Sequence, residues 1–168
     1  MRRIALLSLC LAGAVAGVAH AQDRSLDETL EHVNRLLKDN SYVDHDGQPT
    51  VSRVKLAKGG MLIVETTKTK SGNLFTNAYE VALEDLDVLR VQSRSRDAYV
   101  SISLGAKGPV TGKLKCKMAG GIEHEWNLPA TTEIAVELRA NSGVERDLTS
   151  ALSQLIAKAR QDERYRVT

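Results

Sequence analysis

The hydrophobic pattern between residues 50 and 138 limits the possible folds more than any other feature. Apolar and polar residues alternate there in short runs, and polar or glycine-containing segments separate the runs. No helical pattern interrupts them, so consecutive strands lack crossover helices and we expect a mostly antiparallel sheet. The runs predict about seven strands: Arg53–Leu56, Met61–Thr67, Phe75–Leu83, Val88–Ser93, Tyr99–Leu104, Val110–Met118 and Thr132–Leu138.

The segments between these runs are expected to be turns and loops. Lys58-Gly59-Gly60 and Ser71-Gly72-Asn73 are typical of hairpin turns. Gly105–Pro109 is expected to be a loop, and Glu123-His124-Glu125 is expected to lie in a solvated acidic loop before the last strand.

Two amphipathic helices flank the strands. Ser25 and Glu28 have the spacing of a capping box, and the apolar positions that follow predict a helix over 25–39 with His32 at its surface. Ser142 and Glu145 have the same spacing, and a continuous apolar stripe predicts a second helix over 143–160. We expect Arg160 to face solvent.

Together these elements predict an α+β fold, with an N-terminal helix, a sheet over 50–138 that forms a curled sheet or small barrel, and a C-terminal helix. The hairpin around Gly59-Gly60 and the closing helix from Val144 to Ala159 resemble the pleckstrin-homology-like superfold in their order, over residues 50–160. That resemblance implies a seven-stranded antiparallel barrel closed by the C-terminal helix, and a binding module with no ligand specified.

Residues 1–21 have the pattern of a secretory signal peptide. Arg2 and Arg3 precede an apolar run, and the run closes on Ala19-His20-Ala21. We expect cleavage after Ala21, a single mature domain over 22–168, and a periplasmic or secreted location. An uncleaved N-terminal anchor is the alternative.

Charge excludes one class of partner. The formal net charge of +2 comes from Arg2 and Arg3, and the 147 residues that follow the signal peptide hold 21 basic and 21 acidic side chains. That balance argues against a dedicated nucleic-acid binder.

Basic residues nevertheless gather on the predicted hairpins. Such a surface would attract an anionic envelope surface or an acidic envelope protein. The alternative is a solvated sheet face whose lysines protect exposed edges from aggregation. The candidate binding lysines are Lys55, Lys58, Lys68, Lys70, Lys113, Lys115 and Lys117.

Cys116 is the one cysteine that remains after the predicted cleavage, so the mature chain forms no internal disulfide. Strand alternation places the neighbouring lysines on the opposite face, which favours a buried, inert thiol. A reactive thiol would need a histidine close by in the fold.

Glu123, His124 and Glu125 form the most metal-like cluster in the sequence. In an extended segment the two glutamates share a face and His124 points the other way, which is poor geometry for one site unless His45 or another residue joins it. The segment Asp44-His45-Asp46-Gly47 suggests calcium, but Lys55 occupies the position where an EF-hand loop needs a carboxylate. We interpret it as a polar turn.

Trp126 is the one tryptophan in the chain. It could stack on a sugar or a base, but we expect a core anchor or a residue beneath a loop.

The chain has no nucleophile-elbow, P-loop, dinucleotide-binding or H-E-x-x-H motif, and we predict no cofactor. The sequence therefore favours an exported, non-catalytic binding module that acts through its sheet face or basic hairpins. Two alternatives stay open, a metal- or thiol-dependent enzyme using Glu123, His124, Glu125 or Cys116, and a carrier of a small apolar ligand in a barrel cavity.

Overall fold

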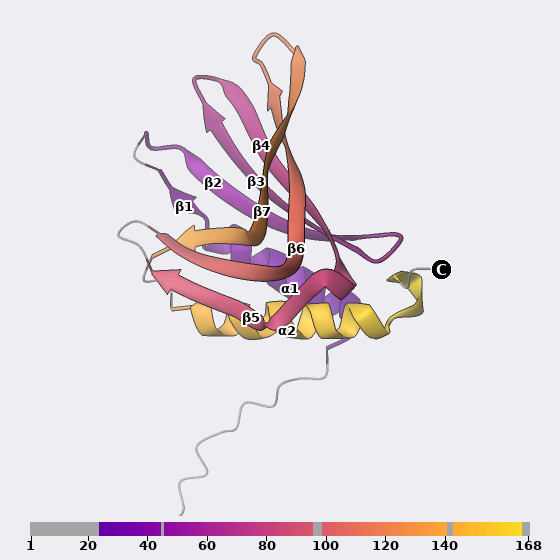
Figure 1. Cartoon of the computed structure of the whole chain (residues 1–168). Helices are drawn as coiled ribbons and strands as arrows, with labels where there is room; N and C mark the ends of the chain where they lie inside the picture. The colour runs from indigo at the N-terminus through magenta and orange to yellow at the C-terminus, as the bar shows by residue number, and fades with distance from the viewer. Residues whose placement is uncertain (1–23, 45, 96–98, 141–142, 166–168) are drawn as a thin grey trace, which may run out of the picture.

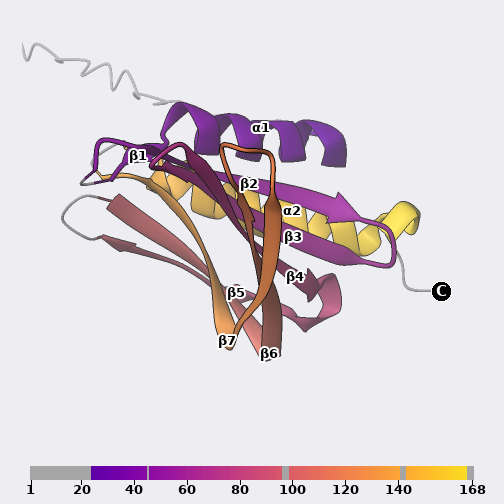
Figure 2. The ribbon, with the colours of Figure 1, turned by 90° about the horizontal axis from the view of Figure 1, so that it is seen from above.

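The computed structural model describes residues 24–44, 46–95, 99–140 and 143–165, so the predicted signal peptide, His45 and Ser142 lie outside the described residues. Two helices pack beside a strongly curled antiparallel sheet (Figures 1 and 2). The elements are α1 Leu26–Asp39, β1 Tyr42–Val43, β2 Pro49–Ala57, β3 Met61–Lys70, β4 Asn73–Ala82, the 3-10 helix η1 Leu83–Asp85, β5 Leu86–Ser95, β6 Tyr99–Lys117, β7 Glu123–Arg139, α2 Glu145–Gln161 and the 3-10 helix η2 Glu163–Tyr165.

If β4 and β5 are counted as one strand interrupted by η1, the sheet is a simple antiparallel meander. Both pair with the same edge of β6, β4 along its C-terminal half and β5 along its N-terminal half. β7 pairs with the other edge of β6 along most of its length. The sheet bends at η1, and the two halves form a half-barrel. This confirms the predicted α+β fold, with a curled antiparallel sheet between an N-terminal and a C-terminal helix.

Two predicted loops are wrong, and one strand was missed. Gly105–Pro109 is not a loop, because β6 runs through it and joins two predicted strands. Register shifts against β7 between Gly105 and Gly112 absorb the bend there. The expected acidic loop is likewise the start of β7, and β1 was not predicted.

Arg160 joins α2 to the bend, contrary to the expectation that it faces solvent. Its guanidinium donates to the carbonyl of Leu83 at 2.8 Å and also to the carbonyl of Leu86. These carbonyls lie at the two ends of η1, where the strand ladder is interrupted. A buried carbonyl without a partner is costly, so the helix supplies donors that the sheet cannot.

Two further basic side chains satisfy carbonyls around the same bend. Lys107 donates to the carbonyl of Glu84 at 2.7 Å, and Arg90 donates to that of Ala106 at 3.2 Å. Arg90 also passes close over Gly105, where an added Cβ would lie 2.7 Å from the Arg90 side chain. Glycine is therefore required at that position for steric reasons.

α1 begins as predicted and covers the outer edge of β2. The Ser25 hydroxyl accepts from the Glu28 N–H at 3.2 Å and the Glu28 carboxylate accepts from the Ser25 N–H at 2.7 Å, which confirms the capping box. Further along, the Asn34 amide donates to the Val54 carbonyl and accepts from the Val54 N–H, both at 2.8 Å. One side chain thus replaces a neighbouring strand at the middle of β2.

His32 is buried between the two helices, so its prediction as a surface residue is wrong. It is 7% exposed and its Nε2 lies 3.3 Å from a carboxylate oxygen of Asp147 on α2. Ser142 of the capping box predicted for the second helix lies outside the described residues. The helix begins at Glu145, and Val144 at the N-cap has no side-chain acceptor.

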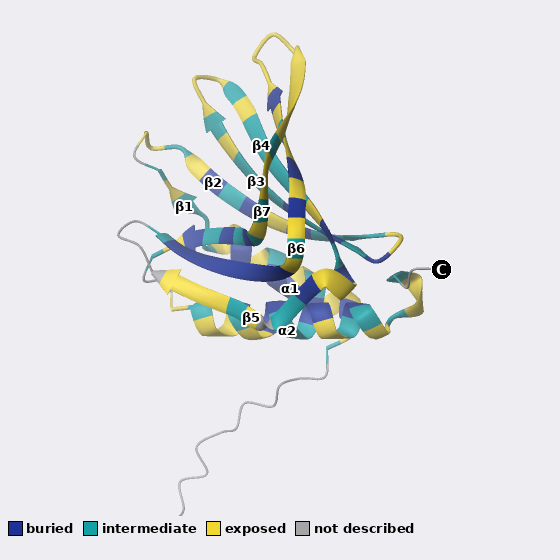
Figure 3. Cartoon of the chain, viewed as in Figure 1, coloured by how far each residue is buried: buried dark blue, intermediate teal, exposed yellow. Residues whose placement is uncertain are grey.

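The hydrophobic core lies between the helices and the bent part of the sheet. Figure 3 shows the buried residues gathered at this end, with mostly exposed and half-buried residues toward the opposite end. Fully buried side chains come from both helices and from the strands that the helices approach, including Leu37, Leu62, Ile102, Leu104, Ile134, Leu138, Leu148, Leu152 and Leu155. The helices leave the far end of the sheet uncovered.

Replacing Arg160 tests the bend. In Arg160→Met the carbonyls of Leu83 and Leu86 lose their donor, and we expect the free energy of unfolding to fall by about 1–3 kcal/mol. Urea unfolding followed by far-ultraviolet circular dichroism measures it. Arg146→Met is the matched control, because Arg146 is exposed on the same helix. Equal stability of the two variants would contradict the proposed part of Arg160 in the bend.

Candidate functional site

The uncovered end of the sheet carries two chemically different faces. We call this end, which bears the β3–β4 turn and the β6–β7 turn, the free end. Cross-strand register places Thr76, Lys115 and Glu125 in one row, and Phe75, Cys116 and His124 in the next. Because successive side chains of a strand point to opposite faces, charged residues gather on one face and apolar and aromatic residues on the other.

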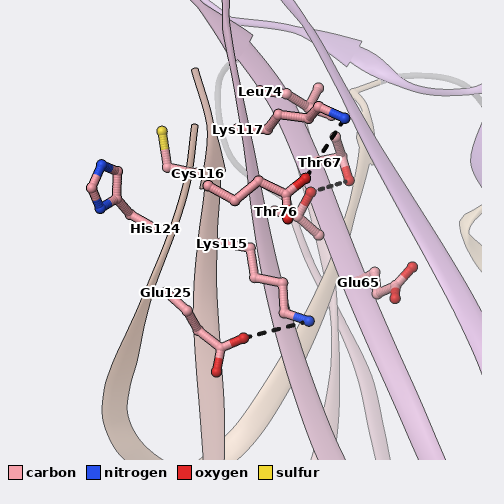
Figure 4. Close-up of a pocket in the computed structure, with 10 residues that line it drawn as sticks. Glu65, Thr67, Leu74, Thr76, Lys115, Cys116, Lys117, His124 and Glu125 are labelled. Atoms are coloured by element: carbon pink, nitrogen blue, oxygen red, sulfur yellow. Dashed lines mark hydrogen bonds and ion pairs between the residues drawn. The ribbon is translucent and has the colours of Figure 1, made fainter. Parts of the chain in front are cut away.

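The charged side, which we call the lysine face, is a lattice of ion pairs. The Lys113 Nζ lies 2.7 Å from Glu125, and the Lys115 Nζ approaches the same carboxylate at 3.5 Å. The Lys117 Nζ lies 3.6 Å from Glu123. Figure 4 shows this face, with Glu65, Thr67, Thr76, Lys115 and Glu125 on it, whereas Cys116 and His124 point the other way. The side chains surround a hollow of about 380 Å³.

The seven candidate lysines do not form one positive surface. Lys55 joins the lysine face but is paired with Glu65 at 2.7 Å. Lys58 lies in the turn between β2 and β3, at the other end of these strands. Lys68 falls on the opposite face, in the row of Phe75 and Cys116. Lys70 lies 3.8 Å from Asp46. Interleaved acids therefore balance most of the predicted basic patch.

Glu125 is the electrostatic centre of the lysine face. Its hydrogen bond from Lys113, with the charges of Lys113 and Lys115, lowers the pKa of the Glu125 carboxyl below its usual value. The same hydrogen bond raises the pKa of Lys113. Both side chains are well exposed to solvent, so the pair orders the surface without adding much to stability.

Large apolar side chains gather on the other face and at the turns of the free end. Trp126 is 48% exposed and its ring stacks on His124, with centroids 5.6 Å apart. The expectation that Trp126 is a core anchor is therefore wrong. Half-buried Phe75 and Leu114 lie in the same rows. Met118 and Ile122 continue this alternation at the β6–β7 turn, where they are 40% and 59% exposed.

We call Phe75, Leu114, Met118, Ile122 and Trp126 the apolar strip. Leu74, on the lysine face, is also exposed next to the β3–β4 turn. The sequence pattern did not predict this concentration. Leu74, Met118 and Ile122 lie within two residues of turn glycines, but Leu62 lies equally close to Gly60 and is fully buried, so only the tertiary structure distinguishes them.

Cys116 is buried, as predicted, with the neighbouring lysines exposed on the opposite face. Its cross-strand partner is His124, so the fold does bring a histidine next to the thiol. Within the described residues no hydrogen bond joins the two, and the His124 ring stacks on Trp126 instead. The structure therefore supplies proximity but not the geometry of an activated thiol.

The metal candidates do not converge. Glu123 and Glu125 share the lysine face and His124 points away from them, as the alternation predicted. Among the described residues no group of three His, Cys, Asp or Glu side chains is placed to hold a metal ion. Asp44 accepts hydrogen bonds from the backbone N–H groups of Asp46 and Gln48 at 3.0 and 2.9 Å, which confirms the polar turn.

No family model, curated protein or solved structure matches this chain. The resemblance to the pleckstrin-homology-like superfold therefore stays a prediction. In the part of the chain that the structure describes, no helix has both the length and the apolar character to cross a membrane.

A charge-pair variant tests the lysine face. Because the pKa of Glu125 is lower in the folded protein, its ionised carboxylate stabilises the fold at pH values above its usual pKa. This contribution to stability is lost as the pH falls through the folded-state pKa of Glu125. In Lys113→Met we expect the pKa of Glu125 to rise toward its usual value, measured by side-chain carboxyl NMR. Lys58→Met should leave it unchanged. An unchanged pKa in Lys113→Met would show that the pair does not form in solution.

Thiol labelling tests the state of Cys116. Because the side chain is 6% exposed, we expect iodoacetamide to react at least about tenfold more slowly with native protein than with protein in urea. A native rate that equals or exceeds the unfolded rate would indicate an activated, accessible thiol and would favour the enzyme alternative.

Proposed function

We propose that this protein is an exported, non-catalytic binding module that contacts a partner protein through the apolar strip. One observation carries the proposal. Of the five exposed large apolar side chains in the described residues, Leu74, Met118, Ile122 and Trp126 lie at the end of the sheet that both helices leave uncovered, and the fifth is Val43 on β1. Most of the other large apolar side chains are buried in the core or packed against it. Exposed apolar surface of this kind is typical of interaction sites.

The composition of the strip supports a protein partner. Tryptophan, phenylalanine and methionine are enriched in the centres of protein interfaces, and lysine and glutamate are depleted there. Trp126 offers a large rigid surface that is half exposed and already oriented by its stacking on His124. Such a residue suits a binding hot spot, because little side-chain freedom is lost when a partner covers it.

The lysine face is the weaker candidate for the contact. Lys55, Lys113, Lys115 and Lys117 each lie within 4 Å of a glutamate carboxylate. An anionic surface would have to compete with those carboxylates. We therefore propose that the lysine face keeps this end of the sheet soluble and separated from other copies, as interspersed charges do on exposed sheets.

Export is part of the proposal and rests on the amino-terminal sequence. The basic start, the apolar run and the Ala19-His20-Ala21 ending support secretion to the periplasm or beyond. The partner is accordingly expected among envelope or secreted proteins.

A thiol-dependent enzyme is the second candidate function, because Cys116 and His124 are cross-strand neighbours. It requires a change that exposes the thiol and frees His124 from Trp126. The labelling experiment above separates it from the binding module, since only a reactive thiol would be modified rapidly in the native protein.

Site-specific photocrosslinking in cells of the source organism tests the binding module. We expect a photoreactive phenylalanine analogue at Ile122 or Trp126 to give a discrete, reproducible adduct with another protein. The same analogue at Ser150, exposed on α2, should give none. Adducts of equal yield at all three positions, or none at Ile122 and Trp126, would overturn the proposal.

A further inference from the structure

The first half of β7 is an open edge of the sheet. Glu123–Leu128 pairs with β6 on one side, and no strand in the described part of the chain pairs with its other side. The segment from Glu123 to Asn127 is exposed. Six residues of extended strand give an edge about 20 Å long. An edge of this kind presents unpaired backbone donors and acceptors to any strand that approaches it.

The register identifies which backbone groups face outward. The Met118 N–H donates to the Ile122 carbonyl at 2.8 Å, which makes this pair a hydrogen-bonded one. Bonded and non-bonded pairs alternate from there along an antiparallel ladder. The backbone groups of Glu123, Glu125 and Asn127 therefore point away from β6, and those of His124 and Trp126 point toward it.

Specific groups close two other stretches of strand edge, one on β2 and one on β7. The Asn34 amide occupies the Val54 N–H and carbonyl on the outer side of β2. Over the second half of β7, the Ser52 hydroxyl accepts from the Glu137 N–H at 3.1 Å, and the Asn40 carbonyl accepts from the Arg139 N–H at 2.7 Å. One strand is thus closed over its second half and open over its first.

Pro129 marks the end of the open part. Proline has no N–H, so a strand added along β7 could not continue its ladder past this residue. The usable edge is therefore Glu123–Leu128, which lies beside the apolar strip and includes its tryptophan.

We propose that this edge accepts an extended segment of a partner protein as an additional strand, of about six residues in which apolar residues alternate with lysine or arginine. The proposal rests on the proposed function and specifies its partner. Backbone hydrogen bonds to Glu123, Glu125 and Asn127 provide affinity, and side chains on the two faces provide selectivity.

The two faces of the edge define that pattern. On one face, apolar side chains of the added strand contact Trp126 and His124. On the other, the outermost charges are the carboxylates of Glu123 and Glu125, because their lysine partners lie one strand further in. Basic side chains of the added strand therefore meet glutamate first, which is the favourable cross-strand combination.

A second copy of the chain fits the edge less well. The two-fold antiparallel pairing that overlaps Glu123–Asn127 fully would place Glu125 directly opposite Glu125 of the other copy. Like charges at directly opposite positions are destabilising. Charge complementarity thus favours a basic segment of a different protein.

Amide hydrogen exchange by NMR tests the edge directly. The probe is an acetylated, amidated six-residue peptide that alternates lysine and valine. Without it, the outward N–H groups of Glu125 and Asn127 should exchange quickly and the inward ones of His124 and Trp126 slowly. With saturating peptide we expect exchange at Glu125 and Asn127 to slow at least about tenfold, with no change at Arg53 on β2.

Two control peptides and one pair of variants sharpen the test. A peptide with the same composition but three lysines followed by three valines, and one that alternates glutamate and valine, should each bind at least about fivefold more weakly. Asn127→Pro removes an outward N–H without changing charge and should weaken binding about tenfold. Asn127→Ser, the matched control, keeps that N–H and should bind like the wild type.

The outcomes separate this proposal from the proposed function. Strand addition is overturned if the peptide does not protect Glu125 and Asn127 at millimolar concentration, or if all three peptides bind equally. In either case, photocrosslinked adducts at Trp126 would still support the binding module. Without peptide, protection of Glu125 and Asn127 could rise with protein concentration, and sedimentation could show dimers. That result would overturn the proposed partner segment and assign the edge to a second copy of the chain. If Asn127→Pro does not fold, the exchange pattern of the wild-type protein decides alone.

Discussion

The structure depends on how the chain satisfies its backbone groups where the sheet bends. β4 gives way to β5 through η1, so several carbonyls there have no partner strand. Arg160 from α2, with Lys107 and Arg90 from the sheet itself, donates to carbonyls around this bend. These bonds connect α2 to the bend, and they connect β6 with η1 and β5 on its two sides. The bend produces the half-barrel, and both helices pack at that end of the sheet, which leaves the free end exposed (Figures 1 and 3).

Because the bend brings the helices to one end, the sheet has two ends with different surroundings. Near the helices, β2, β6 and β7 carry buried side chains, and Asn34, Ser52 and Asn40 bond to the outer edges of β2 and β7. At the free end, neither face is covered by a helix, so the alternation of each strand separates two solvent-exposed chemistries. Paired lysines and glutamates occupy one face, and the apolar strip occupies the other. The proposed binding surface is thus a consequence of where the core ends.

Sequence patterns identified most of the fold, because its elements are locally determined. Among the residues that the structure describes, alternation located six of the seven strands at least in part, and the apolar stripes located both α-helices within two residues of their ends. The same alternation correctly separated Cys116 from its lysine neighbours. The errors fall where a long-range contact decides the structure. Gly105–Pro109 resembles a loop locally but is held in β6 by strands on both sides, and His32 resembles a surface residue until α2 packs over it.

The candidate site shows the same division between local and long-range information. The sequence by itself determined which residues share a face, because side chains of a strand alternate whatever the strand pairs with. It also supplied the balanced charge and the amino-terminal export pattern. Only the tertiary structure decided that glutamates from β3 and β7 lie against the lysines, that Trp126 is exposed, and that the first half of β7 has an open edge. Those facts depend on which strands become neighbours and where the helices stop, and both are set by packing between residues far apart in the chain.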